Sequence, residues 1–119
     1  MLIKRENLNR INNIIEVLKQ KRIFSISTKY KFLKIQEQIK KEYELYYNLI
    51  QDLKDRYNGE IMSDGAIKFS DEDMPKINQE LFLFNQEEIT FIDLKFSLDE
   101  LEGSDLSWEE LEILMPFIK

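Results

Sequence analysis

Apolar residues recur at helical spacing in two segments of the N-terminal half. In the first segment they occupy one face at intervals of three and four residues: Leu8, Ile11, Ile15 and Leu18. In the second segment two rows that each repeat every seven residues run side by side: Phe32, Ile39, Tyr46 and Leu53, and Tyr43, Ile50 and Tyr57. This spacing is typical of amphipathic helices. It predicts helices over 7–20 and 27–57, folded back on each other as a long helical hairpin.

The second predicted helix is much longer than the first. At 1.5 Å per residue it spans about 45 Å, so the first helix can cover only part of its apolar face. The remainder needs either the C-terminal half of the chain or a second copy of it. A homodimer is therefore one arrangement that the sequence allows.

After Gly59 apolar and polar residues alternate instead of following a helical period. The dipeptide Asp64-Gly65 lies between two short apolar runs and suits the positive φ angles of a type I′ turn. The sequence therefore predicts a β-hairpin over 60–69, with Met62 opposite Ile67.

A third helix and a further strand are predicted next. The helix extends over 70–85, and Pro75 places its true start near Asp73, because proline is tolerated only in the first turn. Residues 88–96 alternate again, which predicts a strand or extended arm packed beside the hairpin.

The last part of the chain contains the same helix-start pattern twice, at Ser97-Leu98-Asp99-Glu100 and at Ser107-Trp108-Glu109-Glu110. In each copy a serine is followed three residues later by a glutamate, and these two residues form a capping box. The pattern predicts two short C-terminal helices, divided by Gly103 and stopped near Pro116.

These elements make an α+β fold that is mainly α, in a single domain over 1–119. The net charge is −6, but the two halves of the chain differ in sign. Residues 1–58 hold 13 Lys and Arg against 7 Asp and Glu, whereas residues 59–119 hold 4 against 16. The predicted domain therefore joins a basic helical hairpin, 1–58, to an acidic α+β half, 59–119.

The composition argues against an enzyme. The chain has neither His nor Cys, so it lacks disulfides, thiolate ligands and the commonest general base. Asp71, Glu72 and Asp73 do not follow the spacing of a calcium loop, and the first turn of a helix accounts for them. Adjacent carboxylates such as Glu87 and Glu88 have the wrong spacing to flank a scissile bond. We expect no catalytic residues, no metal and no cofactor.

The sequence also bears on location. The longest purely apolar run extends from Leu81 to Phe84, far short of the roughly 20 residues that cross a bilayer. The first residues lack the apolar stretch of a secretory signal. We therefore expect a cytoplasmic protein without a membrane partner.

Basic and aromatic residues cluster at the predicted joint between the first two helices. A basic stretch over 19–22 is followed by residues that could contact phosphate or stack on bases: Phe24, Lys29, Tyr30, Lys31 and Lys34. The net negative charge of the chain works against this use. Nucleic acid is therefore a less favoured partner than protein.

The C-terminal residues resemble a group of proteins. The tail is similar to that of small phage and prophage proteins of Gram-positive bacteria whose role is uncharacterised, through Leu101-Glu102-Gly103-Ser104-Asp105-Leu106-Ser107-Trp108-Glu109-Glu110-Leu111-Glu112 and Pro116-Phe117-Ile118. Those proteins commonly have Pro or Ser and then Ala-Glu-Leu in place of Trp108-Glu109-Glu110-Leu111, and an acidic residue near Met115. The resemblance implies a phage accessory protein expressed inside an infected bacterial cell, and it transfers no catalytic residue.

We expect a non-enzymatic protein that binds, and inhibits or redirects, a host protein such as a defence protein. An alternative is a structural or assembly role among phage proteins through helical self-association, and a third is an acidic mimic of nucleic acid. The candidate partner-binding residues are acids of the third helix and tail, two tyrosines and a tryptophan: Glu72, Asp73, Glu80, Glu109, Glu112, Tyr43, Tyr47 and Trp108.

Overall fold

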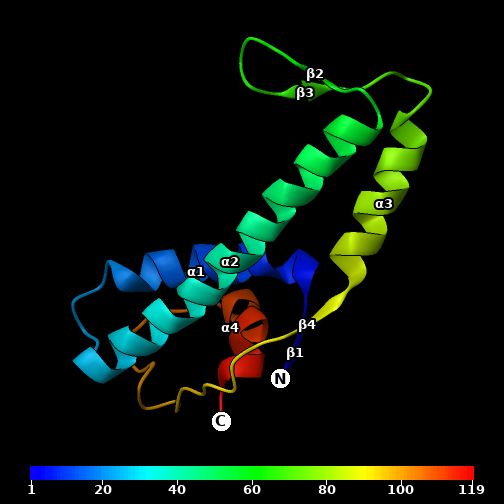
Figure 1. Cartoon of the computed structure of the whole chain (residues 1–119). Helices are drawn as coiled ribbons and strands as arrows, with labels where there is room; N and C mark the ends of the chain where they lie inside the picture. The colour runs from blue at the N-terminus through cyan, green and yellow to red at the C-terminus, as the bar shows by residue number, and fades with distance from the viewer.

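The computed structural model describes residues 1–119 and shows an elongated molecule of 52 × 28 × 23 Å (Figure 1). Its helices are α1 Leu8–Lys19, α2 Ile26–Arg56, α3 Met74–Gln86, α4 Trp108–Leu114 and the 3-10 helices η1 Arg5–Asn7 and η2 Met115–Phe117. Every helix is either too short or too polar to cross a lipid bilayer. The strands are β1 Leu2–Lys4, β2 Glu60–Ile61, β3 Ile67–Lys68 and β4 Glu88–Thr90. The predicted class, α+β and mainly α, is confirmed.

The helices α1 and α2 form the predicted helical hairpin. Ser25 caps α2, and its Oγ accepts a hydrogen bond from the Thr28 N–H at 3.2 Å, which satisfies a first-turn amide that has no partner inside the helix. The apolar faces of both helices meet β1, β4 and the C-terminal segment in the main core. Burying each large apolar side chain there contributes about 1.5–3 kcal/mol. The main core comprises Ile3, Leu8, Ile11, Ile14, Ile15, Leu18, Phe24, Phe32, Ile35, Ile39, Ile89, Phe91, Phe96, Leu101, Leu114 and Phe117.

The strand predicted over 88–96 is shorter and has a different neighbour. Only Glu88–Thr90 forms β4, and it pairs with β1, with Ile3 opposite Ile89. The hairpin β2–β3 is a separate sheet, so the expected packing beside it is wrong. The reason is that Ile3 and Ile89 lie on the buried side of the β1–β4 sheet and face the main core. After β4 the chain runs without regular structure until Phe96, which bridges to Ile118.

The β-hairpin lies where the sequence predicts it, but its register differs by one residue. Ile61, not Met62, is opposite Ile67. The loop has three residues, because the Met62 N–H donates to the Ala66 carbonyl and the Gly65 N–H donates back to the Met62 carbonyl. Gly65 has a φ of 86°, whereas Asp64 does not have a positive φ. The expected type I′ turn needs positive φ at both positions, and a three-residue loop with one left-handed glycine forms instead.

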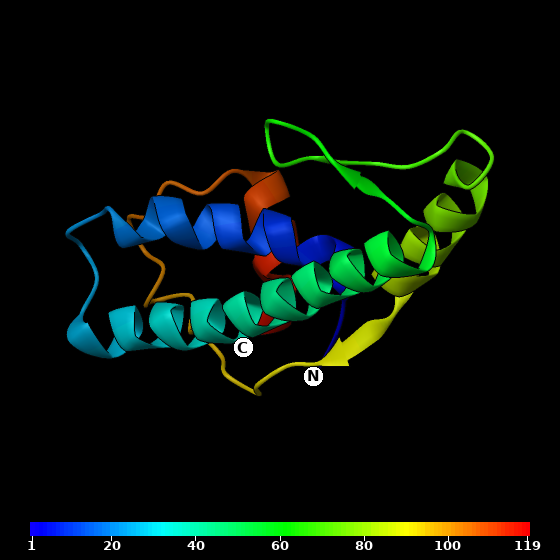
Figure 2. The same cartoon turned by 45° about the horizontal axis from the view of Figure 1, so that its top comes forward.

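An arm projects from the main core (Figures 1 and 2). It consists of the C-terminal half of α2, the hairpin β2–β3 and α3, which runs back alongside α2. Leu53 and Ile77 are its two buried residues, and they lie outside the main core. Arg56 and Glu80 add a salt bridge of 2.8 Å between the two helices of the arm. The arm is therefore held by far less buried surface than the rest of the molecule, which we call the body.

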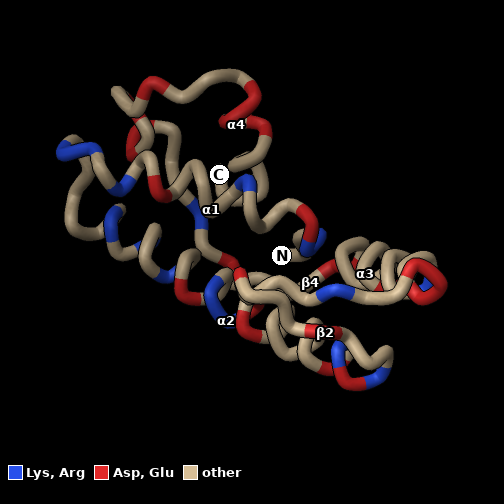
Figure 3. Tube along the Cα trace, turned by 90° about the horizontal axis from the view of Figure 1, so that it is seen from above, with Lys and Arg blue, Asp and Glu red and all other residues tan.

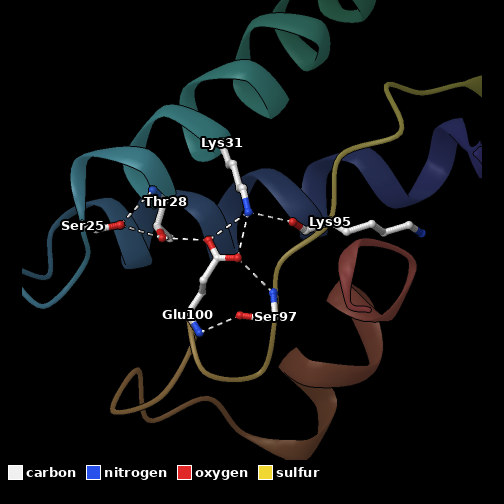
Figure 4. Close-up of polar contacts among 6 residues, drawn as sticks. All are labelled: Ser25, Thr28, Lys31, Lys95, Ser97 and Glu100. Atoms are coloured by element: carbon white, nitrogen blue, oxygen red, sulfur yellow. Dashed lines mark hydrogen bonds and ion pairs between the residues drawn. The ribbon is translucent and has the colours of Figure 1, made fainter.

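The two capping boxes of the C-terminal segment form, but only one starts an α-helix. Ser107 and Glu110 cap α4 reciprocally. Ser97 and Glu100 make the same two hydrogen bonds, each of 3.1 Å, yet residues 98–103 form successive turns instead of the first predicted helix. The backbone bonds of this segment join residues three apart, from Leu101 to Leu98 and from Glu102 to Asp99, and Gly103 with a φ of 79° ends it before an α-helix is established. Figure 4 shows that the Glu100 carboxylate binds Lys31 of α2 while it keeps its bond to Ser97.

Candidate binding groove at Tyr43

The middle of α2 is the part of the long helix that its neighbours leave uncovered. Because α1 has 12 residues and α2 has 31, α1 covers only the first half of α2. The side chains of Tyr43, Tyr46 and Tyr47 follow one helix face at positions i, i+3 and i+4. They remain 41%, 37% and 63% exposed. We call these three residues the tyrosine face.

A groove of about 430 Å³ opens beside the tyrosine face. It is lined by residues of η1, the start of α1, α2 and the end of α3: Arg5, Glu6, Leu8, Asn9, Glu42, Tyr43, Tyr46 and Asn85. The Tyr43 hydroxyl donates a hydrogen bond to Asn9 Oδ1 at 3.4 Å. Partial burial raises the pKa of Tyr43 above its usual value, because a phenolate would lose hydration there. The phenol is therefore a neutral hydrogen-bond donor in this groove.

Arg5 holds the walls of the groove together. Its Nη1 donates to the Phe84 carbonyl at 2.8 Å and to the Glu87 carboxylate at 2.9 Å, and its Nε donates to Glu42 at 3.3 Å. The guanidinium also lies 3.8 Å from the centre of the Phe84 ring. One planar side chain thereby links η1 to α2 and to the C-terminal end of α3. Lysine cannot reproduce this set of contacts, because its ammonium lacks the flat, forked donor geometry of arginine.

Two further hollows adjoin the groove and share Tyr43 with it. One of about 460 Å³ is lined by Lys40, Tyr43, Glu44, Tyr47 and Asn48. The other, of about 260 Å³, includes Asn12, Glu16 and Gln36 from the seam between α1 and α2. Phenols, amides and charged groups therefore alternate along a continuous surface centred on Tyr43. These groups can donate and accept hydrogen bonds, but the surface contains no cluster suited to holding a metal ion.

The acidic candidates do not share one surface. Figure 3 shows acidic residues near the start of α3, on the arm, and others on α4, in the body. Glu72 is exposed before α3, and Asp73 is its half-buried N-cap residue. Glu109 and Glu112 are exposed on α4. The sequence predicted these residues as a group, but the fold separates them into two places.

Glu80 is engaged within the arm. Its carboxylate accepts from Arg56 Nη2 at 2.8 Å and from the Tyr57 hydroxyl at 3.0 Å. The Arg56 contact, followed by the Tyr57 hydrogen bond, lowers the pKa of Glu80, and the same hydrogen bond raises the pKa of Tyr57. The Glu80 carboxylate is therefore already used in contacts that hold the two helices of the arm together.

Trp108 is the first residue of α4 and is 84% exposed. It does not line the Tyr43 groove. Glu112 lines a different groove, between α4 and β1. The predicted partner-binding residues thus fall into three groups, of which only Tyr43 and Tyr47 lie together at one hollowed surface.

The basic stretch is partly used inside the fold. Lys31 binds Glu100, Lys21 donates to the Ser104 carbonyl, and Phe24 is buried. Phe24 therefore cannot stack on a base. Three of the cations already have partners, since Lys19 also pairs with Glu16 at 3.6 Å. Tyr30 stays exposed, with Lys34 5.3 Å from the centre of its ring.

The walls of the groove were not predictable from local pattern. Arg5, Glu42 and Asn85 come from positions far apart in the chain, and no motif marks any of them. Tyr43 was predicted from its place in the apolar repeat of the long helix, and Tyr47 as an aromatic residue of the same helix outside that repeat. The chain matches no family model, no curated protein and no solved structure.

Proposed function

We propose that this protein acts without catalysis, by binding another protein through the tyrosine face of α2 and the groove beside it. The observation that carries the proposal is the concentration of three exposed tyrosines next to a groove of about 430 Å³ whose walls Arg5 fixes. Tyrosine is enriched at protein interfaces because it supplies large, rigid contact area with one polar tip.

Arg5 makes the groove suitable for recognition because it pre-forms the walls. A site that is already shaped loses less conformational freedom on binding than a mobile one. The contacts of Arg5 to Glu42, to the Phe84 carbonyl and to Glu87 exist without any partner. The tyrosines can therefore act as anchors on a fixed base.

The proposed partner is a host protein that the chain inhibits or redirects inside an infected bacterial cell. This part rests on the resemblance of the tail to small phage and prophage proteins. The same tyrosine face would also serve self-association in an assembly role, because a second copy could cover it. The two roles differ in what covers the face, so one experiment separates them.

The experiment compares the wild-type chain with a Tyr43→Ala/Tyr47→Ala variant as baits in lysates of uninfected and infected cells, with mass spectrometry of captured proteins. We expect one stoichiometric host protein from uninfected lysate. Truncating one interface tyrosine costs about 1.4 kcal/mol or more of binding free energy, so the double variant should bind this protein about 100-fold more weakly. Tyr30→Ala is the matched control, since Tyr30 is an exposed tyrosine of α2 outside the groove.

The alternatives have distinct outcomes. Capture of phage proteins alone, lost in the double variant, would favour assembly. Wild-type protein that forms oligomers in solution, while the double variant is a monomer, would show that a second copy covers the face. Retention of the host protein by the double variant at wild-type affinity would contradict the proposed surface.

A further inference from the structure

The two edges of the β1–β4 sheet differ in whether they are covered. At the β4 edge, Gln38 of α2 takes the place of a third strand. Its Nε2 donates to the Thr90 carbonyl at 2.8 Å, and its Oε1 accepts from the Ile92 N–H at 2.9 Å. A side-chain amide has the same donor and acceptor as a peptide group. The backbone groups of this edge are therefore satisfied within the chain.

The β1 edge has no such cover. The Arg5 N–H donates to the Glu87 carbonyl, and the Phe91 N–H donates to the Met1 carbonyl. With Ile3 opposite Ile89, the backbone groups of Met1, Ile3 and Arg5 therefore point toward β4. Since backbone groups alternate in direction along an antiparallel strand, those of Leu2 and Lys4 point the other way. Their N–H groups and the Leu2 carbonyl are open to a further strand. The Leu2 side chain is 63% exposed.

A groove of about 360 Å³ runs along β1, and α4 with η2 forms its other wall. The α4 side contributes Glu112, Ile113 and Pro116. Lys4 lies opposite Glu88 in the pairing of β1 with β4, but the two make no salt bridge. Glu112 is exposed and makes no salt bridge either. The groove therefore combines an open strand edge, an apolar wall and two carboxylates, Glu88 and Glu112.

We propose that this groove binds an extended segment of another polypeptide, which adds a strand to β1. The main chain of the segment pairs with Leu2 and Lys4, an apolar side chain packs on Ile113 and Pro116, and a Lys or Arg of the segment meets Glu112. Strand addition of this kind takes affinity from backbone hydrogen bonds and specificity from pockets for alternate side chains. The surface is separate from the tyrosine face and does not depend on it.

A single extended chain fits this groove better than a second copy of the protein. If β1 of another copy paired with this edge, β4 of that copy would have to lie one strand further out. Glu112, Ile113 and Pro116 line the other side of the groove, so a second copy would have to place two strands in front of them instead of one. A lone segment needs no such space, because its outer edge can face the wall.

Lys4→Pro tests the proposal with little cost to the fold. The φ of Lys4 is −67°, which proline also adopts, and the Lys4 N–H makes no contact that the folded chain needs. The substitution removes one open donor and fills the edge with the proline ring. Lys4→Ala is the matched control, because it removes the same side chain but keeps the N–H. Circular dichroism and thermal unfolding check that both variants fold.

The probe is a displayed library of random 12-residue peptides, selected on the wild-type protein and followed by synthesis of the enriched sequences. We expect enriched peptides that alternate apolar and polar residues and carry a Lys or Arg. They should bind the Tyr43→Ala/Tyr47→Ala variant as they bind wild type, and Lys4→Ala at least as tightly as wild type, because losing the Lys4 charge makes the groove more negative. They should bind Lys4→Pro at least tenfold more weakly. Glu112→Gln should weaken binding and reduce its sensitivity to salt.

Amide exchange gives an independent check. Binding should slow exchange of the Leu2 and Lys4 amides, whereas the Ile3 amide already points to β4. The proposal is overturned if no peptide is enriched, or if the peptides bind folded Lys4→Pro as tightly as wild type. Dimerisation of the wild-type protein that Lys4→Pro abolishes would also overturn it, in favour of a second copy at this edge.

Discussion

Lys31 of α2 binds Glu100 of the C-terminal segment across 69 positions of the chain, with Nζ 2.7 Å from Oε1 (Figure 4). The same carboxylate accepts from the Thr28 hydroxyl at 2.9 Å and from the Ser97 N–H at 3.1 Å. Lys31, followed by these hydrogen bonds, lowers the pKa of Glu100 from 4.5 to about 2 against the opposing effect of burial. The carboxylate is therefore stabilised in its charged form where α2 meets the tail.

Replacing Glu100 by Gln should lower the free energy of unfolding by about 2 kcal/mol at neutral pH, because charged hydrogen bonds are lost and Lys31 keeps no anion. A carboxyl whose folded pKa is depressed stabilises the fold above its unfolded pKa and loses that effect as pH falls. The difference between wild type and Glu100→Gln should therefore shrink as the pH falls from about 4.5 to about 2. Urea unfolding at several pH values measures it.

Glu102→Gln is the control for that series, since Glu102 is exposed and makes no salt bridge. It should unfold like wild type across the same pH range. A constant difference between Glu100→Gln and wild type from neutral pH to pH 2 would show that charge on Glu100 does not stabilise the junction.

Replacing Arg5 by Lys should lower the stability by about 1–3 kcal/mol, because the Phe84 carbonyl and the two carboxylates cannot all be satisfied by one ammonium. The α3 end should then loosen, which faster amide exchange in 84–87 would report. Arg10→Lys is a matched control at an exposed arginine of α1. Unchanged exchange in the Arg5 variant would mean that the walls of the groove are fixed by other contacts.

The arm should open more readily than the body. The arm has two buried apolar residues, Leu53 and Ile77, whereas the main core has 16. Amides of α3 should therefore exchange through local openings of lower free energy than amides of α1. Leu53→Ala should destabilise the arm by about 3 kcal/mol and leave exchange in α1 unchanged. Leu45→Ala, at an exposed leucine of the same helix, should change little. Equal protection of α1 and α3 in wild type would contradict this division.

Gly65→Ala should weaken the β-hairpin by about 1 kcal/mol. The φ of Gly65 is 86°, and a new Cβ meets no atom within 4 Å, so the cost is conformational and not a clash. Gly65→Asn should cost less, because asparagine enters this region more easily. Exchange of the Met62 amide, which is bonded to Ala66, reports both. If the Met62 amide exchanges at the same rate in Gly65→Ala and in wild type, the turn does not limit the stability of the hairpin.

The two helices of the hairpin, α1 and α2, were predictable because the sequence signals that mark them are local. The seven-residue repeat of Phe32 and Ile39 marks α2, and its observed bounds, Ile26–Arg56, are one residue from the predicted 27–57 at each end. The register of the β-hairpin was not predictable, because Asp64-Gly65 suits both a two-residue and a three-residue loop. One additional loop residue shifts every pair of opposite residues in the two strands. The Ser97-Glu100 box predicted a helix that does not form, because the same two hydrogen bonds also occur in a run of tight turns that Gly103 ends.

The candidate sites show the same limit. Tyr43 was found from its place in a helical repeat, but Arg5 joins three elements that no sequence window contains. Gln38 is an ordinary polar residue of α2 in the sequence, and its role at the β4 edge exists only once β4 has been placed. Contacts between distant segments decide both sites, and a single sequence carries no record of them.

The helix α2 passes from the body into the arm without a loop between them (Figure 1). Its 31 residues span about 46 Å at 1.5 Å per residue. A continuous helix resists bending far more than a linker of the same length, so the arm cannot swing freely about the body. Two molecules bound at the opposite ends of this helix would be kept at a set separation. The length of α2 therefore sets the distance between the two ends of the molecule.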